Sequence, residues 1–347
     1  MSGVQIIAEV GVNHNGEIDR ARALVDAAAS AGADIVKFQA FRSRDLVADD
    51  APTASYQKQN TGQVTQHEML EPLELSPDQL AELADHCRAR KVEFLCTAFD
   101  PTMITALAEM GMQRIKVASG ELNNLPALAH FAATGLPVLL STGMATMDDV
   151  RLAVKTLREN NAGDITLLHC TSLYPAPMDS VNLNAMVTLR DAFNVAVGYS
   201  DHTLGNHVAV AAVALGATVI EKHLTLDRGL PGPDHAASIE PVEFAAMCTM
   251  LRATALALGD GVKVPSAAEL DVALVVRKSW HAAADLEAGT VLAADDVCLK
   301  RPATGLSAAQ SPVGYRLKVA RAADQPIRET DVLAMECPGV TAEERSA

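Results

Sequence analysis

Short apolar runs alternate with helix-length segments along most of this chain, and that alternation restricts its fold more than any other feature. Each run has the length of a buried strand and is rich in Val and Ile, a pattern typical of consecutive βαβ units with a parallel sheet. Eight runs are found, over residues 5–11, 34–39, 93–99, 114–119, 138–142, 165–171, 195–201 and 218–223. Eight such units predict an α/β fold of the closed (β/α)8 TIM-barrel type.

An open, doubly wound sheet is the alternative arrangement of such units. Open sheets that bind dinucleotides carry a G-x-G-x-x-G turn after the first strand, and nothing similar follows residues 5–11. We therefore predict a barrel over residues 1–261. Helices are predicted over amphipathic segments that include 19–31, 77–90, 101–110, 147–160, 206–216 and 242–258.

The pattern changes after Gly259-Asp260-Gly261. Residues 262–276 are interpreted as a linker, and residues 277–338, with short strands and turns, as a compact, mostly β module. About sixty residues bury only a modest core, so we expect this module to dock on another surface. The polar tail, residues 339–347, is predicted to be disordered.

Composition excludes several classes of partner. The net charge is −15 and no Lys/Arg run is dense enough to bind nucleic acid or a membrane surface. No apolar stretch has the length of a membrane span, and the amino terminus lacks the pattern of a signal peptide, so we expect a cytoplasmic protein. The six cysteines are scattered without a C-x-x-C pair, which is typical of free thiols in a reducing compartment and not of metal ligands.

Two histidines stand at the ends of successive predicted strands: His202 follows residues 195–201, and His223 ends residues 218–223. Neighbouring parallel strands lie about 4.8 Å apart, so both imidazoles can reach one divalent ion. A structural role, with each ring bonded to nearby backbone, is the alternative. Imidazole suits manganese, zinc, cobalt or iron, and the lack of a clear third ligand predicts open positions for water or substrate.

Polar side chains also collect on one face of three predicted strands. Side chains two residues apart share a face, and the pairs concerned are Lys37 and Gln39, Ser200 and His202, and Glu221 and His223. Buried charges are costly without partners. Such a cluster near the carboxyl ends of apolar strands indicates a functional site.

Two lysines, Lys37 and Lys116, lie near the ends of the second and fourth strands. Hydroxyl groups stand at neighbouring strand ends, on Thr97, Ser119, Ser172 and Ser200. Two ammonium groups with several hydroxyls predict an anion pocket for phosphate, or for phosphate plus carboxylate. The alternative for each lysine is a structural ion pair, for example with Glu9 or Glu121.

Three further features allow both a functional and an ordinary interpretation. Glu9 closes the first strand and is either paired with a lysine or placed for proton transfer and metal-water contact. Asp234 ends the turn Pro231-Gly232-Pro233-Asp234, as a site residue or a plain turn aspartate. The long polar segment 41–75 either covers the site or is a surface excursion.

Several segments together resemble the sialic acid synthase family. They are AEVGVNHNG (8–16), VKFQ (36–39), KVASGE (116–121), LLSTGM (139–144), LLHCTSLYPAP (167–177), GYSDHT (198–203), EKHLT (221–225) and PGPDHAAS (231–238). The C-terminal module is similar to type III antifreeze protein, with Leu-Lys-Arg-Pro at 299–302. The resemblance covers nearly the whole chain.

This resemblance implies a transferase that condenses phosphoenolpyruvate with an N-acylated hexosamine such as N-acetylmannosamine and releases phosphate by C–O cleavage. N-acetylneuraminate is the expected product, with legionaminate or deaminated neuraminate (KDN) as alternatives by the same mechanism. A metal-dependent keto-acid aldolase and an inactive sugar-binding protein are more distant alternatives.

The resemblance also implies roles for individual residues. A divalent ion, manganese with magnesium or cobalt as alternatives, would be held by His202 and His223 and would polarise the sugar aldehyde. Glu9 would position or deprotonate the water or a sugar hydroxyl. The residues implied to hold phosphoenolpyruvate are Lys37, Thr97, Lys116, Ser119, Ser172 and Ser200.

The sugar side would be lined by Gln39, Glu121, Tyr174 and Asp234. Ser172 stands where some members of the family place asparagine, which shortens the reach of that donor. Arg301, in the C-terminal module, would contact the sugar's acyl group in the partner's barrel, which implies a domain-swapped homodimer.

Overall fold

The computed structural model describes residues 3–333. Eight parallel strands form a closed barrel in chain order, and the last strand pairs with the first. Their bounds are β1 (Gln5–Glu9), β2 (Ile35–Ala40), β3 (Glu93–Ala98), β4 (Ile115–Val117), β5 (Val138–Ser141), β6 (Ile165–Cys170), β7 (Ala196–Asp201) and β8 (Val219–His223). The predicted (β/α)8 barrel is confirmed, and each strand lies within its predicted run to within one residue.

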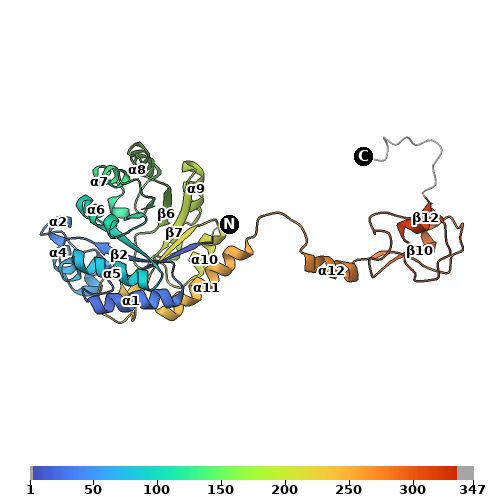
Figure 1. Cartoon of the computed structure of the whole chain (residues 1–347), viewed down its shortest axis with the longest axis horizontal. Helices are drawn as coiled ribbons and strands as arrows, with labels where there is room; N and C mark the ends of the chain where they lie inside the picture. Colours follow the sequence, from blue (N-terminus) through green and yellow to red (C-terminus); the bar gives the residue numbers. More distant parts are fainter. Residues whose placement is uncertain (1–2, 334–347) are drawn as a thin grey trace. The chain divides into compact units, whose positions relative to one another are not determined.

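Helices surround the strands (Figure 1). Those of the barrel are α1 (Ile18–Ala31), α5 (Pro77–Ala89), α6 (Pro101–Glu109), α7 (Leu125–Ala132), α8 (Met147–Glu159), α9 (Asn184–Phe193), α10 (His207–Ala214) and α11 (Pro241–Ala257). Local capping sets where several begin. Ser76 accepts a hydrogen bond from the amide of Gln79 at 3.2 Å, and Asp100 accepts one from Thr102 at 2.8 Å.

Two barrel helices, α7 and α9, are absent from the predicted segments. Helix α7 is short and almost wholly apolar, and a short apolar run can equally be a buried strand. Its start signal is nevertheless present, because Asn124 caps the amide of Ala127 at 3.3 Å. Helix α9 begins without a side-chain cap.

The main core lies between the strands and the helices. Side chains such as Ile6 on β1, Leu24 on α1 and Leu80 on α5 are fully buried there. Strands of this kind are covered on both faces, which explains their nearly continuous apolar sequences. Inside the barrel, in contrast, charged residues from β1, β2, β4 and β8 are buried.

The segment between β2 and α5 contains three short helices, α2 (Ser43–Leu46), α3 (Ser55–Thr61) and α4 (Gln66–Leu70). Thr65 and Glu68 form a capping box at the start of α4. Asn60 donates a hydrogen bond to the carbonyl of Pro233 at 2.8 Å, and thereby ties α3 to the loop after β8. Short 3-10 turns complete the chain: η1 (Glu71–Leu73), η2 (Ser119–Glu121), η3 (Met178–Ser180), η4 (His235–Ala237), η5 (Ala294–Asp296) and η6 (Glu329–Asp331).

A second compact unit begins at Gly261. It contains two small antiparallel sheets, β9 (Ser279–Ala282) with β10 (Val297–Lys300), and β11 (Arg316–Leu317) with β12 (Val332–Leu333). Ala282, Leu292 and Ile327 are buried at the centre of its own small core. The predicted mostly β module is therefore present.

The segment predicted as a linker, residues 262–276, contains the helix α12 (Ala267–Val276). Ser266 and Glu269 form a capping box at its start, a sequence signal that the linker interpretation overlooked. None of the residues of α12 is buried. The predicted disordered tail, residues 339–347, lies outside the described residues. Across residues 3–333, no helix has the length and apolar character needed to span a membrane.

Candidate active site

A cavity of about 560 Å³ opens at the carboxyl ends of the barrel strands, where barrel enzymes place their active sites. Every strand contributes to its lining, through Glu9, Lys37, Gln39, Thr97, Lys116, Ser141, Cys170, Ser200, Glu221 and His223. The polar face that side-chain alternation predicts is therefore the inner face of the barrel.

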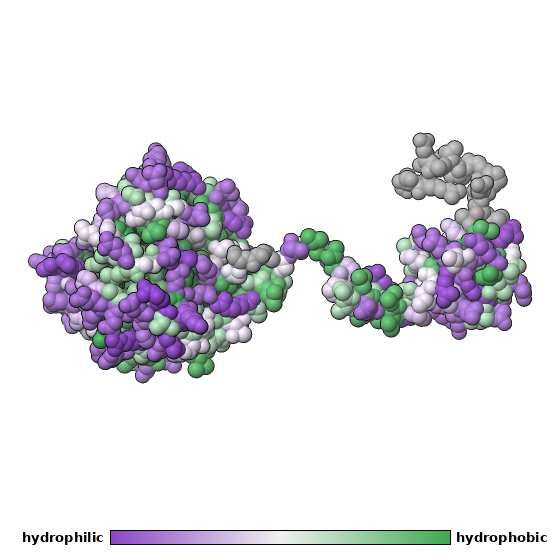
Figure 2. Space-filling model, in the orientation of Figure 1, coloured by the Kyte–Doolittle hydropathy of each residue, from purple (hydrophilic) through white to green (hydrophobic). Residues whose placement is uncertain are grey.

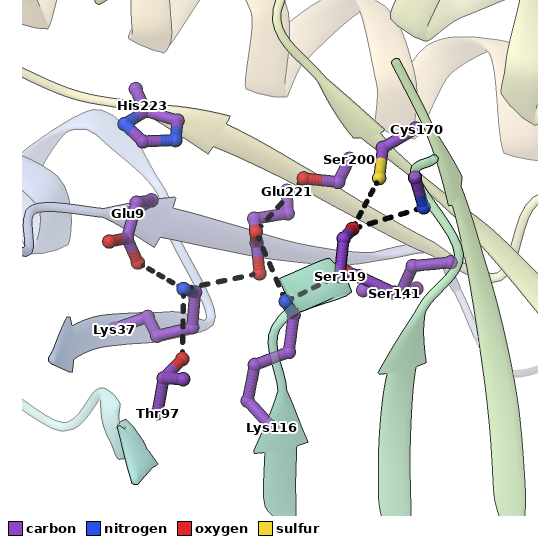
Figure 3. Close-up of polar contacts among 12 residues, drawn as sticks. Glu9, Lys37, Thr97, Lys116, Ser119, Ser141, Cys170, Ser200, Glu221 and His223 are labelled. Carbon is purple, nitrogen blue, oxygen red and sulfur yellow. Dashed lines mark hydrogen bonds and ion pairs between the residues drawn. The ribbon is translucent and has the colours of Figure 1, made fainter. Parts of the chain in front are cut away.

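Charged side chains at the base of this cavity form one network (Figure 3). The Nζ atom of Lys37 lies 2.5 Å from Oε2 of Glu9 and 3.8 Å from Oε2 of Glu221. The Nζ atom of Lys116 lies 3.6 Å from Oε1 of Glu221. Glu221 thus lies between two ammonium groups, while Ser200 donates a hydrogen bond to its Oε1 at 2.9 Å.

Hydroxyl groups complete the surroundings of the lysines. Lys37 donates to Oγ1 of Thr97 at 3.3 Å, and Lys116 donates to Oγ of Ser141 at 2.8 Å. The structural interpretation of the lysines is confirmed by these ion pairs, and the anion pocket stays a prediction. The lysines line the cavity and they are ion-paired, but Lys116 pairs with Glu221 and not with Glu121.

Burial and the neighbouring charges act on these groups in opposite directions. Burial raises the pKa of Glu9 above its usual value. The pKa of Glu221 is lowered, because the attraction of Lys116 and Lys37 outweighs its burial. The pKa of Lys37 is raised, since the two carboxylates outweigh its own burial. The two lysines therefore favour the ionised form of Glu221, whereas burial disfavours the ionised form of Glu9.

Ser119 and Ser172 lie on the side of the cavity formed by β4 to β6. The Oγ atom of Ser119 accepts a hydrogen bond from the amide of Gly143 at 3.0 Å and lies 3.2 Å from Sγ of Cys170. A Cβ atom at Gly143 would lie 2.3 Å from Oγ of Ser172 and 2.8 Å from Oγ of Ser119. Only glycine lets the backbone approach both hydroxyls so closely.

The two predicted metal ligands lie side by side in the cavity. The ring centroids of His202 and His223 are 5.4 Å apart, with an angle of 72° between the rings. Nδ1 of His202 lies 2.7 Å from the carbonyl oxygen of Thr171 and must donate to it, so Nε2 keeps its lone pair. That Nε2 lies 3.1 Å from the hydroxyl of Tyr174.

Both imidazoles are suited to bind a cation. Burial lowers the pKa of His202 to about 4 and that of His223 well below its usual value, so both rings are neutral, as metal ligands must be. Nδ1 of His223 is buried without a hydrogen-bond partner, and Oδ2 of Asp234 lies 3.6 Å from it.

These two rings are the neighbouring imidazole donors in the cavity lining. Nowhere in residues 3–333 do three or more His, Cys, Asp or Glu side chains meet in the geometry of a metal centre. An ion held by the two imidazoles would therefore leave its other positions to water or substrate, which fits the open catalytic type of site.

Aromatic rings line the cavity next to His202. The ring of Tyr174 stacks on His202 at a centroid distance of 4.1 Å, and the ring of Tyr56 stacks on Tyr174 at 5.2 Å. Asp234 also lines this side, and burial, with the charge of Glu9, raises its pKa to about 7. Gln39 donates to Oε1 of Glu9 at 2.7 Å.

Among the implied sugar-side residues, Glu121 does not line the cavity, and Arg301 lies in the other compact unit. Glu121 lies in η2, where it accepts a hydrogen bond from Asn124 at 2.8 Å and does not contribute to the lining. The 3-10 turn directly after β4 ends the alternation of side chains between the two faces of the strand. The direction of the Glu121 side chain therefore cannot be predicted from that alternation. Arg301 belongs to the second compact unit and is exposed there.

Some lining residues were missed from the sequence. Glu221 shares a strand face with His223, so the alternation of side chains predicted the face on which it lies. The alternation did not predict that Glu221 lies between the two lysines. Tyr56, Gln57 and Met69 come from the segment 41–75, which lines the cavity and is therefore more than a surface excursion. A long irregular segment carries no periodicity that would have singled out these side chains.

The fold and the cavity define a class of protein: a (β/α)8-barrel enzyme with buried lysines and paired imidazoles at the carboxyl ends of its strands. Residues 24–263 match the NeuB family. The chain belongs to this family, the sialic acid synthases, which are enzymes of nonulosonic acid biosynthesis, and the resemblance found in the sequence is confirmed.

Relatives extend over almost the whole chain. N,N'-diacetyllegionaminic acid synthase of Campylobacter jejuni is 45% identical over 311 residues, which are 89% of this chain and 93% of the relative. The enzyme of the same name from Legionella pneumophila is also 45% identical, over 90% of each chain. The structure of N-acetylneuraminic acid synthetase from Leptospira borgpetersenii superposes with a TM-score of 0.71 at 34% identity, covering 78% of this chain and 90% of that one.

Proposed function

We propose that this protein condenses phosphoenolpyruvate with an open-chain N-acylated amino sugar, forming a nonulosonic acid and releasing phosphate. The observation that carries the proposal is the cluster of Lys37, Glu221 and Lys116 beside two neutral imidazoles in one cavity. The cluster offers cations to an anionic substrate, and the imidazoles offer lone pairs to a metal ion.

The charges of the network suit an anion of this kind. The net charge of the two lysines and two glutamates is zero when all four side chains are ionised. Lys37 and Lys116 both line the cavity, so an anionic ligand there can compete with Glu221 for their ammonium groups. Thr97, Ser119, Ser172 and Ser200 then supply hydroxyl donors around the two ammonium groups, as a ligand with a phosphate and a carboxylate requires.

A manganese ion, with magnesium or cobalt as alternatives, would be held by His202 and His223. When bound, it would act as a Lewis acid on the sugar aldehyde. Tyr174 would orient the sugar next to His202, because its ring packs against that imidazole and its hydroxyl reaches the Nε2 atom.

In the proposed reaction, C3 of phosphoenolpyruvate forms a bond to the aldehyde carbon, and water adds to C2. The tetrahedral carbon then expels phosphate by cleavage of its C–O bond, which leaves a 2-keto acid. Glu9 is the residue suited to take the proton from the attacking water. Its Oε1 is oriented by Gln39, and its Oε2 lies against Lys37, which stabilises the charged form.

The relatives favour one sugar over another. Both enzymes at 45% identity are named N,N'-diacetyllegionaminic acid synthases, so we place a 2,4-diacetamido-6-deoxy hexose, which gives a legionaminate, first among the substrates. N-acetylmannosamine, the substrate expected from the sequence, comes second. The N-acetylneuraminate-9-phosphate synthase of Drosophila melanogaster, whose name refers to an N-acetylneuraminate product, is less similar to this chain, at 36% identity. Mannose, which would give KDN, is the remaining alternative.

We also propose that the protein is a homodimer in which Arg301 reaches the partner's sugar. Apolar side chains of α12 support an association of this kind, because Leu270, Val272 and Leu274 are each more than half exposed. They are part of the apolar surface that Figure 2 shows in green along residues 262–276. Apolar surface of this extent is typical of a protein interface.

A phosphate-release assay tests the reaction. The protein would be supplied with phosphoenolpyruvate, Mn²⁺ and, in turn, the diacetamido sugar, N-acetylmannosamine and mannose. Phosphate is expected with at least one sugar, and fastest with the diacetamido sugar. An aldolase would give pyruvate from a keto acid without phosphate, and the absence of phosphate with every sugar would contradict the proposal.

A further inference from the structure

A buried ion pair lies directly behind the two histidines. Asp201 precedes His202 and Lys222 precedes His223, so each charged residue faces away from the cavity while the histidine faces into it. Asp201 and Lys222 are register partners in β7 and β8. Their side chains are fully inaccessible to solvent, and Nζ of Lys222 donates to Oδ2 of Asp201 at 2.8 Å.

The pair also holds the backbone that follows His202. Lys222 donates to the carbonyl oxygens of Thr203 at 2.6 Å and Gly205 at 3.1 Å, so all three ammonium donors are used. The other carboxylate oxygen of Asp201 accepts from the amide of Thr203 at 2.9 Å and from its hydroxyl at 2.7 Å. Five hydrogen bonds thus connect Asp201, Lys222 and the chain around His202.

His202 is therefore fixed on both sides along the chain, by Asp201 before it and Thr203 after it. The same lysine is the chain neighbour of His223. Because one ion pair restrains both backbones, it sets the separation of the two imidazoles from the side opposite to the cavity. Groups behind metal ligands act in this way, by orienting ligands that they do not replace.

We propose that Asp201 and Lys222 are positioning residues, which hold His202 and His223 at the separation that a divalent ion requires. This inference rests on the proposed function, since it concerns the ion that the two histidines would bind. Folding stability alone does not explain the pair, because apolar residues of similar volume often stabilise a fold equally well.

A partly buried ion pair elsewhere in the barrel provides the control. Arg114 and Glu93 join β3 and β4 near their amino ends through two hydrogen bonds, of 2.8 and 3.0 Å. The Glu93→Gln variant weakens this pair without touching the cavity. It therefore reports the effect of a weakened inter-strand ion pair on the barrel as a whole.

The experiment measures Mn²⁺ binding by calorimetry and the Tm of the metal-free protein for the full chain. Asp201→Asn is expected to weaken Mn²⁺ binding by roughly 10–100-fold. The double variant Asp201→Asn/Lys222→Met, which leaves no unpaired buried charge, is expected to regain much of the Tm but not the affinity. Glu93→Gln is expected to lower the Tm and to leave the affinity unchanged.

Wild-type Mn²⁺ affinity in either Asp201 variant, or an equal loss of affinity in Glu93→Gln, would overturn the inference and leave the proposed function intact. Failure of the unaltered protein to bind Mn²⁺ would overturn the metal part of the proposed function, and the inference with it. Mn²⁺ binding by the unaltered protein therefore distinguishes failure of the proposed function from failure of this inference.

Discussion

Glu9 and Lys37 are register partners on adjacent strands, and their side chains meet inside the barrel with 2.5 Å between Oε2 and Nζ. Glu9 is also the register partner of His223 on its other side. One carboxylate on β1 therefore stands between a proposed phosphoenolpyruvate-binding lysine and a proposed metal ligand. This position links the two halves of the proposed reaction, since the attacking water must be deprotonated where both substrates meet.

Lys37→Met should lower both stability and substrate binding. It leaves Glu9 buried without its close cation, and breaking a buried pair in this way costs about 3–5 kcal/mol. The KM for phosphoenolpyruvate should also rise. Urea unfolding and initial-rate kinetics measure the two effects. Lys155→Met is the control, because its ion pair with Glu159 is largely exposed and should contribute less than about 1 kcal/mol. Equal effects of the two variants would contradict the assignment.

Glu9→Gln should act mainly on kcat. The amide keeps the shape of the side chain but cannot accept a proton from water, and general base catalysis contributes roughly 10²–10⁴-fold to rates. Phosphate release at saturating substrates is the measurement. A kcat within about twofold of the unaltered enzyme would show that another group removes the proton.

His202→Ala should abolish Mn²⁺ binding and phosphate release, because only one imidazole would then be left and it could not hold the ion alone. Exhaustive chelation of the unaltered enzyme should have the same effect on turnover, and added Mn²⁺ should restore it. His130→Ala, on the exposed side of α7, provides the control for loss of a histidine. Full activity after chelation, with no residual metal by elemental analysis, would contradict a metal-dependent reaction.

The sequence predicted the parts of the fold and site that depend on local order. Strand runs, helix caps and the positions of His202 and His223 follow from periodicity within single elements. The partners of Glu221 did not follow, because they depend on register around a closed barrel. The helix α12 was missed since it has no polar face, and the place of Glu121 did not follow because this residue lies in a 3-10 turn.

Tyr56→Ala should weaken sugar binding without changing the KM for phosphoenolpyruvate. It removes the ring that supports Tyr174, and such a stacked pair is worth about 0.5–1.5 kcal/mol, or roughly 2–12-fold in KM. Tyr56→Phe keeps the ring and should behave like the unaltered enzyme. A rise in the KM for phosphoenolpyruvate instead would place the segment 41–75 over the other substrate.

Arg301→Ala should raise the KM for the sugar, because a hydrogen bond from a charged group contributes about 1.5–3 kcal/mol, equivalent to roughly 10–150-fold. Arg328→Ala, an exposed arginine of the same unit, is the control. Mixing Arg301→Ala with His202→Ala tests whether Arg301 acts across a dimer. If it does, each mixed dimer contains one complete site, and random exchange should restore about a quarter of the unaltered activity. If Arg301 served its own barrel, both sites of a mixed dimer would be defective, and mixing would restore nothing.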